Sequence, residues 1–251
     1  MALVDYGSST SSECEEEDLS IPRKRPALPT ALTLLGVKQP KCVEEDDLID
    51  DPTQHGGRIR TFKHERGNWA THVYVSALEC NDQLEDFQLE TISKMASMVE
   101  LKASASLHLS LSKTVVLQYH QIDVFASSLQ QALRNCVGFS GTLHDLKIYT
   151  NEERTRTFLA VQLDAVYSNK MHALLRPIDG VMRDFGLPQF YADPSFHISL
   201  LWCVGNEETL MRKKLEELQQ LLNEQEALQL TVNKLHCKCG NKEFIFRLNL
   251  S

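Results

Sequence analysis

Two short stretches decide the fold, Leu107-His108-Leu109-Ser110-Leu111-Ser112 and Phe196-His197-Ile198-Ser199-Leu200. Both contain a histidine, an aliphatic residue and a serine in that order, with apolar residues on either side. Successive side chains of a β-strand point to opposite faces, so the histidine and the serine share one face and the apolar residues lie behind them. In the first stretch Ser112 extends the polar face by one more hydroxyl. We therefore predict two β-strands that each present an imidazole and a hydroxyl from an apolar-backed surface.

The repetition of this pattern is more informative than either copy. A single His-x-Ser on an amphipathic strand is common and predicts no chemistry. His108 and His197 are 89 residues apart, however, and packing alone gives an apolar-backed strand no reason to repeat such a face. We interpret the two copies as one site, in which two strands side by side bring together an acid, a base and an anion clamp.

Charge is distributed unevenly along the 251 residues. Residues 1–55 hold 12 of the 34 acidic residues and 5 of the 26 basic ones, whereas residues 56–251 hold 22 and 21. The nearly neutral second part is long enough to bury a core of its own. The net charge of −8 therefore does not argue against a nucleic-acid substrate for this part.

The cysteines and the hydropathy pattern indicate the compartment. The seven cysteines are an odd number without a Cys-x-x-Cys pair, which argues against a disulfide framework and against a zinc knuckle. We interpret Cys237 and Cys239, on one face of a predicted strand, as packing residues. The sequence shows no signal peptide and no stretch long enough to span a membrane. We expect a soluble intracellular protein with no membrane association, no metal and no cofactor.

Residues 1–55 are predicted to be a disordered acidic leader, because they are rich in Ser, Glu, Asp and Pro and poor in aromatic residues. Within them, Pro22-Arg23-Lys24-Arg25-Pro26 resembles a short nuclear import signal, so we expect the protein in the nucleus. A basic cluster at 58–66 opens the folded part, and it could either neutralise phosphates or form a solvated entry loop.

Periodicity in the remaining sequence predicts alternating strands and helices. We predict strands at 68–75, 107–112, 141–149, 156–163, 196–204, 228–236 and 242–250. We predict helices at 82–100, 122–135, 168–185 (interrupted or kinked near Pro177) and 207–226. The strands at 141–149 and 156–163 are expected to form a hairpin.

These elements predict an α+β fold, because each half of the chain places strands and a helix around one His-x-Ser strand. We expect two lobes related by a pseudo-twofold axis, with antiparallel sheets lining a central cleft and helices outside. Residues 56–251 would form this single domain.

Two histidines and two serines on one surface suit the transesterification of RNA. Histidine titrates near neutral pH, so one imidazole can accept the proton of a ribose 2′-hydroxyl while the other donates a proton to the departing 5′-oxygen. The serine hydroxyls can bind the non-bridging phosphate oxygens, where negative charge develops. Such a reaction needs no metal ion.

The two motifs resemble those of the 2H phosphodiesterase superfamily, whose members are bilobal. Within it, several stretches resemble the phosphodiesterases that process the 3′ end of U6 small nuclear RNA in animals, and the likeness covers about residues 55–251. These stretches are His55-Gly56-Gly57-Arg58, Lys63-His64-Glu65-Arg66-Gly67-Asn68-Trp69-Ala70-Thr71-His72, Lys147-Ile148-Tyr149-Thr150-Asn151 and Tyr191-Ala192-Asp193-Pro194-Ser195-Phe196-His197.

The resemblance implies a metal-independent 3′-to-5′ RNA exonuclease. The family trims 3′-terminal uridines, and in animals also adenosines, from U6 RNA and leaves a 2′,3′-cyclic phosphate. Carried over by position, His108 and His197 would transfer protons, Ser110 and Ser199 would bind the phosphate, and the terminal base would stack on Tyr191. A protein of this kind is expected to act on RNA as a monomer.

Three further positions complete the predicted site. Ser195 is assigned with the substrate-binding residues, and Ser112 and Glu152 are assigned supporting roles. Leu201 stands where the second motif would need the equivalent of Ser112, and Glu152 stands where the human-type sequence has a glutamine.

Two other functions use the same residues. One is another 2H activity, either opening 2′,3′-cyclic phosphates or joining RNA ends by a 2′,5′ linkage. The other is a module that binds RNA ends without catalysis, for which an intact histidine pair has no purpose. The sequence does not say which histidine is the acid, or where trimming stops.

Overall fold

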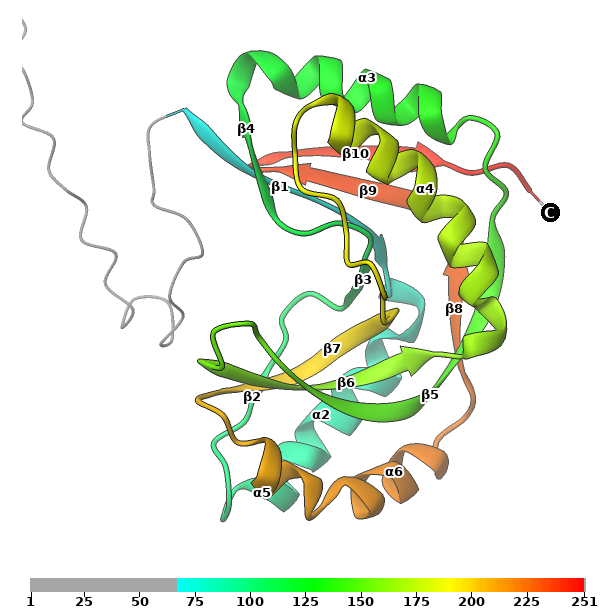
Figure 1. The fold of residues 1–251 in the computed structure, drawn as a ribbon. Coiled ribbons are helices and arrows are strands. Elements are labelled where there is room, and N and C mark those ends of the chain that lie inside the picture. The colour runs from blue at the N-terminus through cyan, green and yellow to red at the C-terminus, as the bar shows by residue number, and fades with distance from the viewer. Residues whose placement is uncertain (1–66, 251) are drawn as a thin grey trace, which may run out of the picture. The chain divides into compact units, whose positions relative to one another are not determined.

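A computed structural model describes residues 67–250 of the protein. The helices and strands follow one another as Figure 1 shows. The strands are β1 (Asn68–Ser76), β2 (Lys102–Ala103), β3 (His108–Ser110), β4 (Val115–Gln118), β5 (Phe139–Thr150), β6 (Arg156–Leu163), β7 (His197–Val204), β8 (Leu228–Val232), β9 (Lys234–Cys239) and β10 (Lys242–Arg247). The helices are α2 (Asn81–Met95), α3 (Ile122–Leu133), α4 (Ser168–Asp184), α5 (Glu208–Arg212) and α6 (Leu215–Asn223). The leader, the import-like cluster and the basic loop lie outside the described residues.

All ten strands belong to one sheet, in the order β10-β9-β1-β3-β7-β6-β5-β8. Two short strands join at its sides, where β4 pairs with β1 and β2 pairs with β7. Every pair of strands is antiparallel. The two lobes meet at β3 and β7, which carry the two histidine motifs, so the lobes share one continuous sheet.

The two lobes are not successive halves of the chain. The first lobe takes β1, β3 and β4 from the N-terminal side, and β9 and β10 from the C-terminal end. The second lobe takes β5 to β8 together with β2, which precedes the first histidine strand. The simple division of the sequence that we predicted is therefore wrong, although each lobe still contains one histidine strand.

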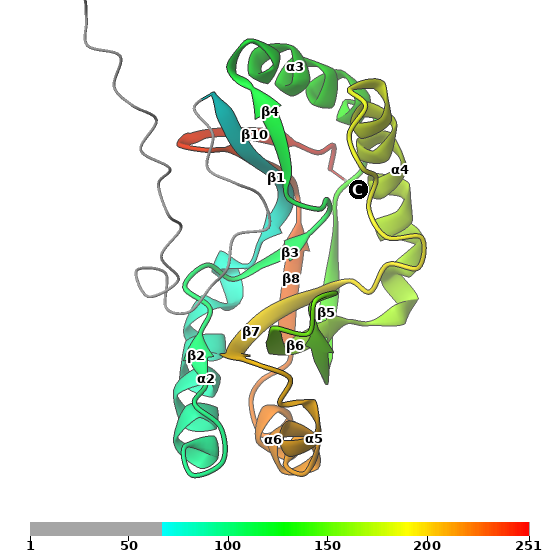
Figure 2. The same cartoon turned by 60° about the vertical axis from the view of Figure 1, so that its left-hand side comes forward.

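The helices gather in two groups. Helix α3 packs against α4 and β10, whereas α6 packs against α2 and β5, and Figures 1 and 2 show the two groups apart from one another. The buried faces of the helices carry large apolar side chains, among them Phe87 of α2 and Phe125 of α3, which are both fully buried. Burial of such aromatic side chains contributes about 1.5–3 kcal/mol each to folding.

Helix α4 ends where the sequence predicts. Gly186 has a φ of +67°, a left-handed conformation that costs glycine nothing, and the amide of Leu187 donates to the carbonyl of Met182 at 2.8 Å. This bond satisfies one of the free carbonyls at the helix end. Pro177 lies inside α4, which continues past it as one helix, so the predicted interruption does not occur.

The predicted helix at 207–226 is two helices, α5 and α6. Residues 143–145 of β5 form a bulge, and α6 is attached to it through one side chain. Gln219 accepts a hydrogen bond from the amide of Leu146 at 2.7 Å and donates one to the carbonyl of His144 at 2.8 Å. These two hydrogen bonds hold α6 against β5.

The predicted strand at 228–236 is also divided. Residues Leu228–Val232 pair with β5 in the second lobe, and Lys234–Cys239 pair with β1 in the first lobe. The chain crosses between the lobes at Asn233, and the apolar positions change phase there, from Leu228, Leu230 and Val232 to Leu235, Cys237 and Cys239. The predicted last strand ends at Arg247 rather than at residue 250. The hairpin at 141–163 is confirmed as β5 and β6.

Candidate active site

The two histidine motifs are direct neighbours in the sheet. Strands β3 and β7 lie beside one another in the sheet (Figure 2). They pair through Leu109 and Ile198, which are fully buried. In an antiparallel pair the residue numbers rise along one strand and fall along the other. His108 therefore lies opposite Ser199, and Ser110 lies opposite His197. Each histidine therefore faces the serine of the other motif. We call the side of the sheet that carries these four residues the histidine face.

The neighbouring strands extend this arrangement into two cross-strand rows. Ladder pairs place Tyr74 opposite Ser110 and Ser76 opposite His108 on β1, and Gln162 opposite His197 and Ala160 opposite Ser199 on β6. One row is thus Tyr74, Ser110, His197 and Gln162, and the other is Ser76, His108, Ser199 and Ala160. Each row contains one histidine and one motif serine.

Both imidazoles are fixed in the same way. Nδ1 of His108 lies 2.8 Å from the carbonyl oxygen of Ser106, and Nδ1 of His197 lies 2.7 Å from the carbonyl oxygen of Ser195. A carbonyl oxygen only accepts hydrogen bonds, so Nδ1 must carry the proton in both rings. Nε2 is then the ring nitrogen that can take up or release a proton.

Burial lowers the pKa of both histidines below the ordinary value of 6.5. The hydrogen bond to the carbonyl of Ser106 opposes this shift in His108, and the bond to Ser195 opposes it in His197. The pKa of His197 is lowered further by the positive charges of Lys147 and His108. The imidazole of His108 is thus close enough for its charge to act on His197.

His197 is supported by a polar network that the sequence analysis missed. The ring of Tyr149 stacks on its imidazole, with centroids 4.0 Å apart and 16° between the planes. The hydroxyl of Tyr149 lies 2.6 Å from the hydroxyl of Ser195, and the amide of Gln162 donates to both oxygens. A glutamine in the apolar run 158–163 was the signal for this network.

His108 lies among aromatic side chains that were also missed. The ring of Tyr74 meets its imidazole edge-on at 5.1 Å, and His72 stacks on Tyr74 at 4.9 Å. The hydroxyl of Tyr74 donates to Glu243 at 2.8 Å, and the same carboxylate oxygen lies 3.0 Å from Nδ1 of the buried His236. Burial, followed by the charges of His108 and a nearby lysine, lowers the pKa of His72 to about 4, so His72 is neutral beside His108. The alternation of His72 and Tyr74 in the first strand was the available signal.

The predicted phosphate ligands differ in their surroundings. Ser110 and Ser199 are half-buried on the histidine face, and neither hydroxyl makes a hydrogen bond within residues 67–250. The hydroxyl of Ser195 is instead held by Tyr149 and Gln162. Ser110 and Ser199 are thus the hydroxyls available to a ligand, and Ser195 supports the surroundings of His197.

Ser112 does not share the histidine face as predicted. Strand β3 ends at Ser110, and the hydroxyl of Ser112 accepts a hydrogen bond from the buried amide of Val73 at 2.8 Å. The alternation of side chains stops with the strand, so the third polar residue turns into the sheet and has a structural role.

Replacing Ser112 with alanine should therefore destabilise the fold without slowing the reaction. The substitution leaves the buried amide of Val73 unpaired, and we expect a loss of about 1–3 kcal/mol in the free energy of unfolding. Urea unfolding would measure it. Ser127→Ala is the control, because that hydroxyl donates to a carbonyl on the exposed side of α3 and should change stability by less than about 0.5 kcal/mol. A large loss of kcat in folded Ser112→Ala protein would contradict this role.

Tyr191 and Glu152 are brought together by a lysine that the sequence analysis did not select. Tyr191 lies in the loop before β7 with 49 % of its surface exposed, and Glu152 lies in the turn between β5 and β6. The ammonium of Lys113 lies 4.4 Å from the centroid of the Tyr191 ring and 3.6 Å from Oε1 of Glu152.

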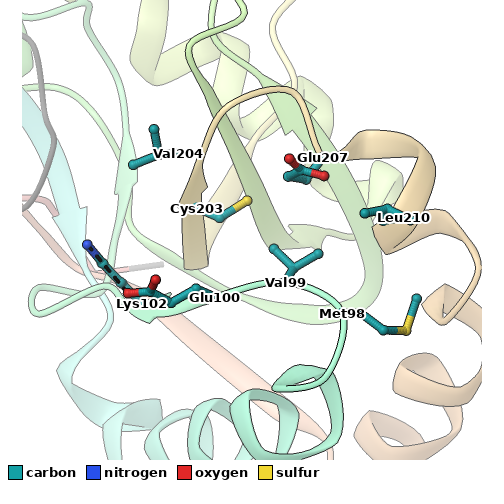
Figure 3. A pocket seen from close by; sticks show the side chains of 8 residues that line it. All are labelled: Met98, Val99, Glu100, Lys102, Cys203, Val204, Glu207 and Leu210. Carbon is teal, nitrogen blue, oxygen red and sulfur yellow. Dashed lines mark ion pairs between the residues drawn. The ribbon is translucent and has the colours of Figure 1, made fainter.

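Other features of the described part bear on metal binding, on membrane spans and on pockets. Among residues 67–250, no group of three or more His, Cys, Asp and Glu side chains could hold a metal ion, and no helix is long and apolar enough to cross a membrane. A pocket of about 300 Å³ lies at the end of β7 remote from His197 (Figure 3), and no imidazole lines it. Its lining residues are Met98, Val99, Glu100, Lys102, Cys203, Val204, Glu207 and Leu210.

Known proteins resemble the chain in sequence and in fold. The HVSL family, described as an uncharacterised conserved protein, matches residues 26–247. U6 snRNA phosphodiesterase 1 of Drosophila melanogaster is 59% identical, over 99% of this chain and 100% of that protein. The proteins of the same name from Danio rerio and Homo sapiens are 40% and 36% identical, over 98% and 96% of this chain and 87% and 96% of theirs. The solved structure of Usb1 from Kluyveromyces marxianus has a TM-score of 0.50 at 16% identity, over 73% of this chain and 99% of that one. This likeness confirms the predicted α+β fold.

Proposed function

We propose, because the chain belongs to the HVSL family and to the family of U6 snRNA phosphodiesterase 1, that it is an RNA phosphodiesterase that processes the 3′ end of U6 small nuclear RNA. The observation that carries the mechanism is the crossed pairing of His108 with Ser199 and of His197 with Ser110. A phosphate bound on the histidine face would then have one imidazole and one hydroxyl from each strand.

The reaction is a transesterification at the last phosphodiester bond. Nε2 of one histidine removes the proton of the penultimate 2′-hydroxyl, and that oxygen attacks the phosphorus. The bond from phosphorus to the terminal 5′-oxygen breaks, and the other histidine protonates the leaving oxygen at its own Nε2. The shortened RNA ends in a 2′,3′-cyclic phosphate and the terminal nucleoside departs.

The remaining groups bind the substrate. The hydroxyls of Ser110 and Ser199 donate to the non-bridging oxygens, where they stabilise charge that grows in the transition state. The terminal base stacks on Tyr191, an interaction that accepts any base because every base has a π-face. The enzyme thus acts on the 3′-terminal residue. The first turnover releases a nucleoside, and a turnover on the resulting cyclic phosphate end releases a nucleoside 2′,3′-cyclic phosphate, because the preceding 2′-hydroxyl then attacks the next phosphate.

One assay distinguishes this function from the two alternative functions. RNA with a 3′-hydroxyl oligouridine tail is incubated with the full chain in the presence of EDTA, and the products are separated by length. Shortening by single nucleotides with a cyclic phosphate end supports the proposal. Action on 2′,3′-cyclic phosphates alone would indicate the related 2H activity, and binding without shortening would indicate an RNA-end-binding module.

The pH dependence of kcat/KM should assign the acid and the base. The profile is expected to be bell-shaped, because the base must be neutral and the acid protonated, and both limbs should lie on the acid side of an ordinary histidine. Lys147→Met removes a charge that lowers the pKa of His197, so the limb that belongs to His197 should move toward higher pH. Movement of the alkaline limb makes His197 the acid, and movement of the acidic limb makes it the base.

Lys147→Arg keeps the positive charge and is the control for this measurement. Its profile should superimpose on that of the wild type. If neither limb of the kcat/KM profile moves in Lys147→Met, the charge of Lys147 does not act on a histidine that transfers a proton. That result would contradict the proposal that His197 is one of the two proton-transfer groups.

We also propose that the protein works in the nucleus. The basic cluster Pro22–Pro26 supports this location, because it has the composition of a short import signal. In a fluorescent fusion, replacing Arg23, Lys24 and Arg25 with alanine should redistribute the protein to the cytoplasm. Unchanged nuclear fluorescence would show that the cluster does not act as the signal.

A further inference from the structure

One lysine beside the histidine face joins loops from both lobes. Lys113 follows β3, the histidine strand of the first lobe, whereas Tyr191 and Glu152 belong to the loop before β7 and to the hairpin turn of the second lobe. The ammonium lies 4.4 Å from the centroid of the Tyr191 ring and 3.6 Å from Oε1 of Glu152. A single charge of the first lobe therefore contacts two loops of the second lobe.

The ammonium of Lys113 occupies one of the two faces of the Tyr191 ring. The cation lies over one face of the ring, and the ring of Phe190 meets Tyr191 at a steep angle of 65°, with centroids 5.0 Å apart. Half of the side chain is still exposed. Because the ammonium already lies over one face of the ring, a base that stacks on Tyr191 would use the face turned away from Lys113.

We propose that Lys113 is a positioning residue for the 3′-terminal nucleotide, which acts by holding Tyr191 in the orientation that the stacked base requires. This inference rests on the proposed function, since it assigns a role within the same RNA-binding site. Tyr191 lies in a loop, so its ring needs an external support. The ammonium provides that support because a cation is attracted to the electron-rich face of an aromatic ring. It also ties the stacking site to the strand that carries His108.

The chain offers a closely matched control. Lys242 lies 4.7 Å from the ring centroid of Tyr119 and 3.8 Å from Oδ1 of Asp123. The side chain of Lys242 is 34% exposed, against 35% for Lys113. This second group lies near Asn68 at the first end of β1, because Asn68 pairs with Gln118, the residue before Tyr119. The histidine strand β3 pairs with the other end of β1. The same type of contact thus occurs once beside the proposed site and once away from it.

The first experiment compares the two lysines in the trimming assay. Lys113→Met should raise KM by roughly two- to fivefold and leave kcat nearly unchanged, which is the size of effect that an exposed cation on a ring can exert. Lys113→Arg should restore the wild-type KM, because a guanidinium also binds the ring face. Lys242→Met should change neither parameter. Equal behaviour of Lys113→Met and Lys242→Met would overturn the proposal.

A double-mutant cycle separates positioning from a direct contact with RNA. If Lys113 acts through Tyr191, Lys113→Met should have no further effect in protein that already carries Tyr191→Ala, because the ring to be positioned is gone. If the lysine binds a phosphate itself, its effect should persist in that background and weaken with added salt. The second outcome would overturn the proposal.

A binding measurement keeps this inference separate from the proposed function. The Kd of a 3′-hydroxyl oligouridine RNA is measured by fluorescence anisotropy for His108→Ala protein, with and without each lysine substitution. Weaker binding on removal of Lys113 but not of Lys242 supports the role of Lys113 whether or not the wild-type chain trims RNA. Unchanged binding contradicts it even if trimming is observed.

Discussion

Replacing His108 or His197 with alanine is expected to lower kcat by about 10²–10⁴-fold, because in the proposed reaction each imidazole carries one of the two proton transfers. The fold should survive, since both rings are half-buried at the surface of the sheet while Leu109 and Ile198 form the fully buried contact between their strands. Single-turnover trimming of oligouridine RNA would measure the loss, and circular dichroism would verify the fold.

His120 provides the control for these substitutions. It is an exposed histidine in the short helix before α3, and His120→Ala should keep the wild-type rate. Either active-site variant that retains more than about a tenth of the wild-type rate would contradict a proton-transfer role.

A substrate with an activated leaving group would then tell the two histidines apart. In uridine 3′-(4-nitrophenyl phosphate) the leaving group departs without a proton, so the variant that lacks the acid should recover much of its rate. The variant that lacks the base should remain slow. This assignment must agree with the limb that moves in the Lys147→Met profile.

The second large effect is expected from the substrate. A 2′-hydroxyl attacks the phosphate that follows it, so RNA with deoxyribose at the penultimate position should resist cleavage almost completely. RNA with deoxyribose only at the terminal position should still lose that residue, because the terminal 2′-hydroxyl takes no part in bond formation. Electrophoresis of the two substrates beside all-ribose RNA would measure the difference.

The same substrates distinguish the two-histidine reaction from a metal-dependent mechanism, in which water attacks and the penultimate 2′-hydroxyl is optional. Trimming of all-ribose RNA should continue in EDTA, and the product should carry a cyclic phosphate. Efficient cleavage of the penultimate-deoxy substrate, or a need for added divalent metal, would rule out the two-histidine reaction.

The sequence identified the two histidines of the candidate site but not the side chains that contact and support them. His108 and His197 could be found because a repeated polar pair on an apolar-backed strand has no packing explanation. Tyr149 and Gln162 support His197 from strands that are remote in the sequence, and neither belongs to a repeated pattern. Lys113 escaped notice for the same reason, since its partners come from two distant loops.

Errors about secondary structure also had physical causes. The segment at 207–226 has a helical pattern throughout, yet its long-range partners divide it into two helices. In the segment at 228–236 the apolar residues change phase at Asn233, which is where the strand divides. Ser112 was placed on the histidine face because alternation was assumed to continue beyond Ser110, where the strand ends. Within that strand, periodicity describes a residue's neighbours along the chain and contains no information about where the strand stops pairing.

The sequence by itself determined that two histidine-serine strands exist, that apolar residues lie behind them, and that a hairpin and helix α4 come between them. These are local properties, set by side-chain alternation and by capping residues such as Gly186. Only the tertiary structure decided that β3 pairs with β7 in the register that sets each histidine opposite the other serine. It alone also decided that the first lobe is closed by the last two strands of the chain. Register and strand order depend on how distant apolar surfaces fit together, and that fit is a property of the whole folded sheet.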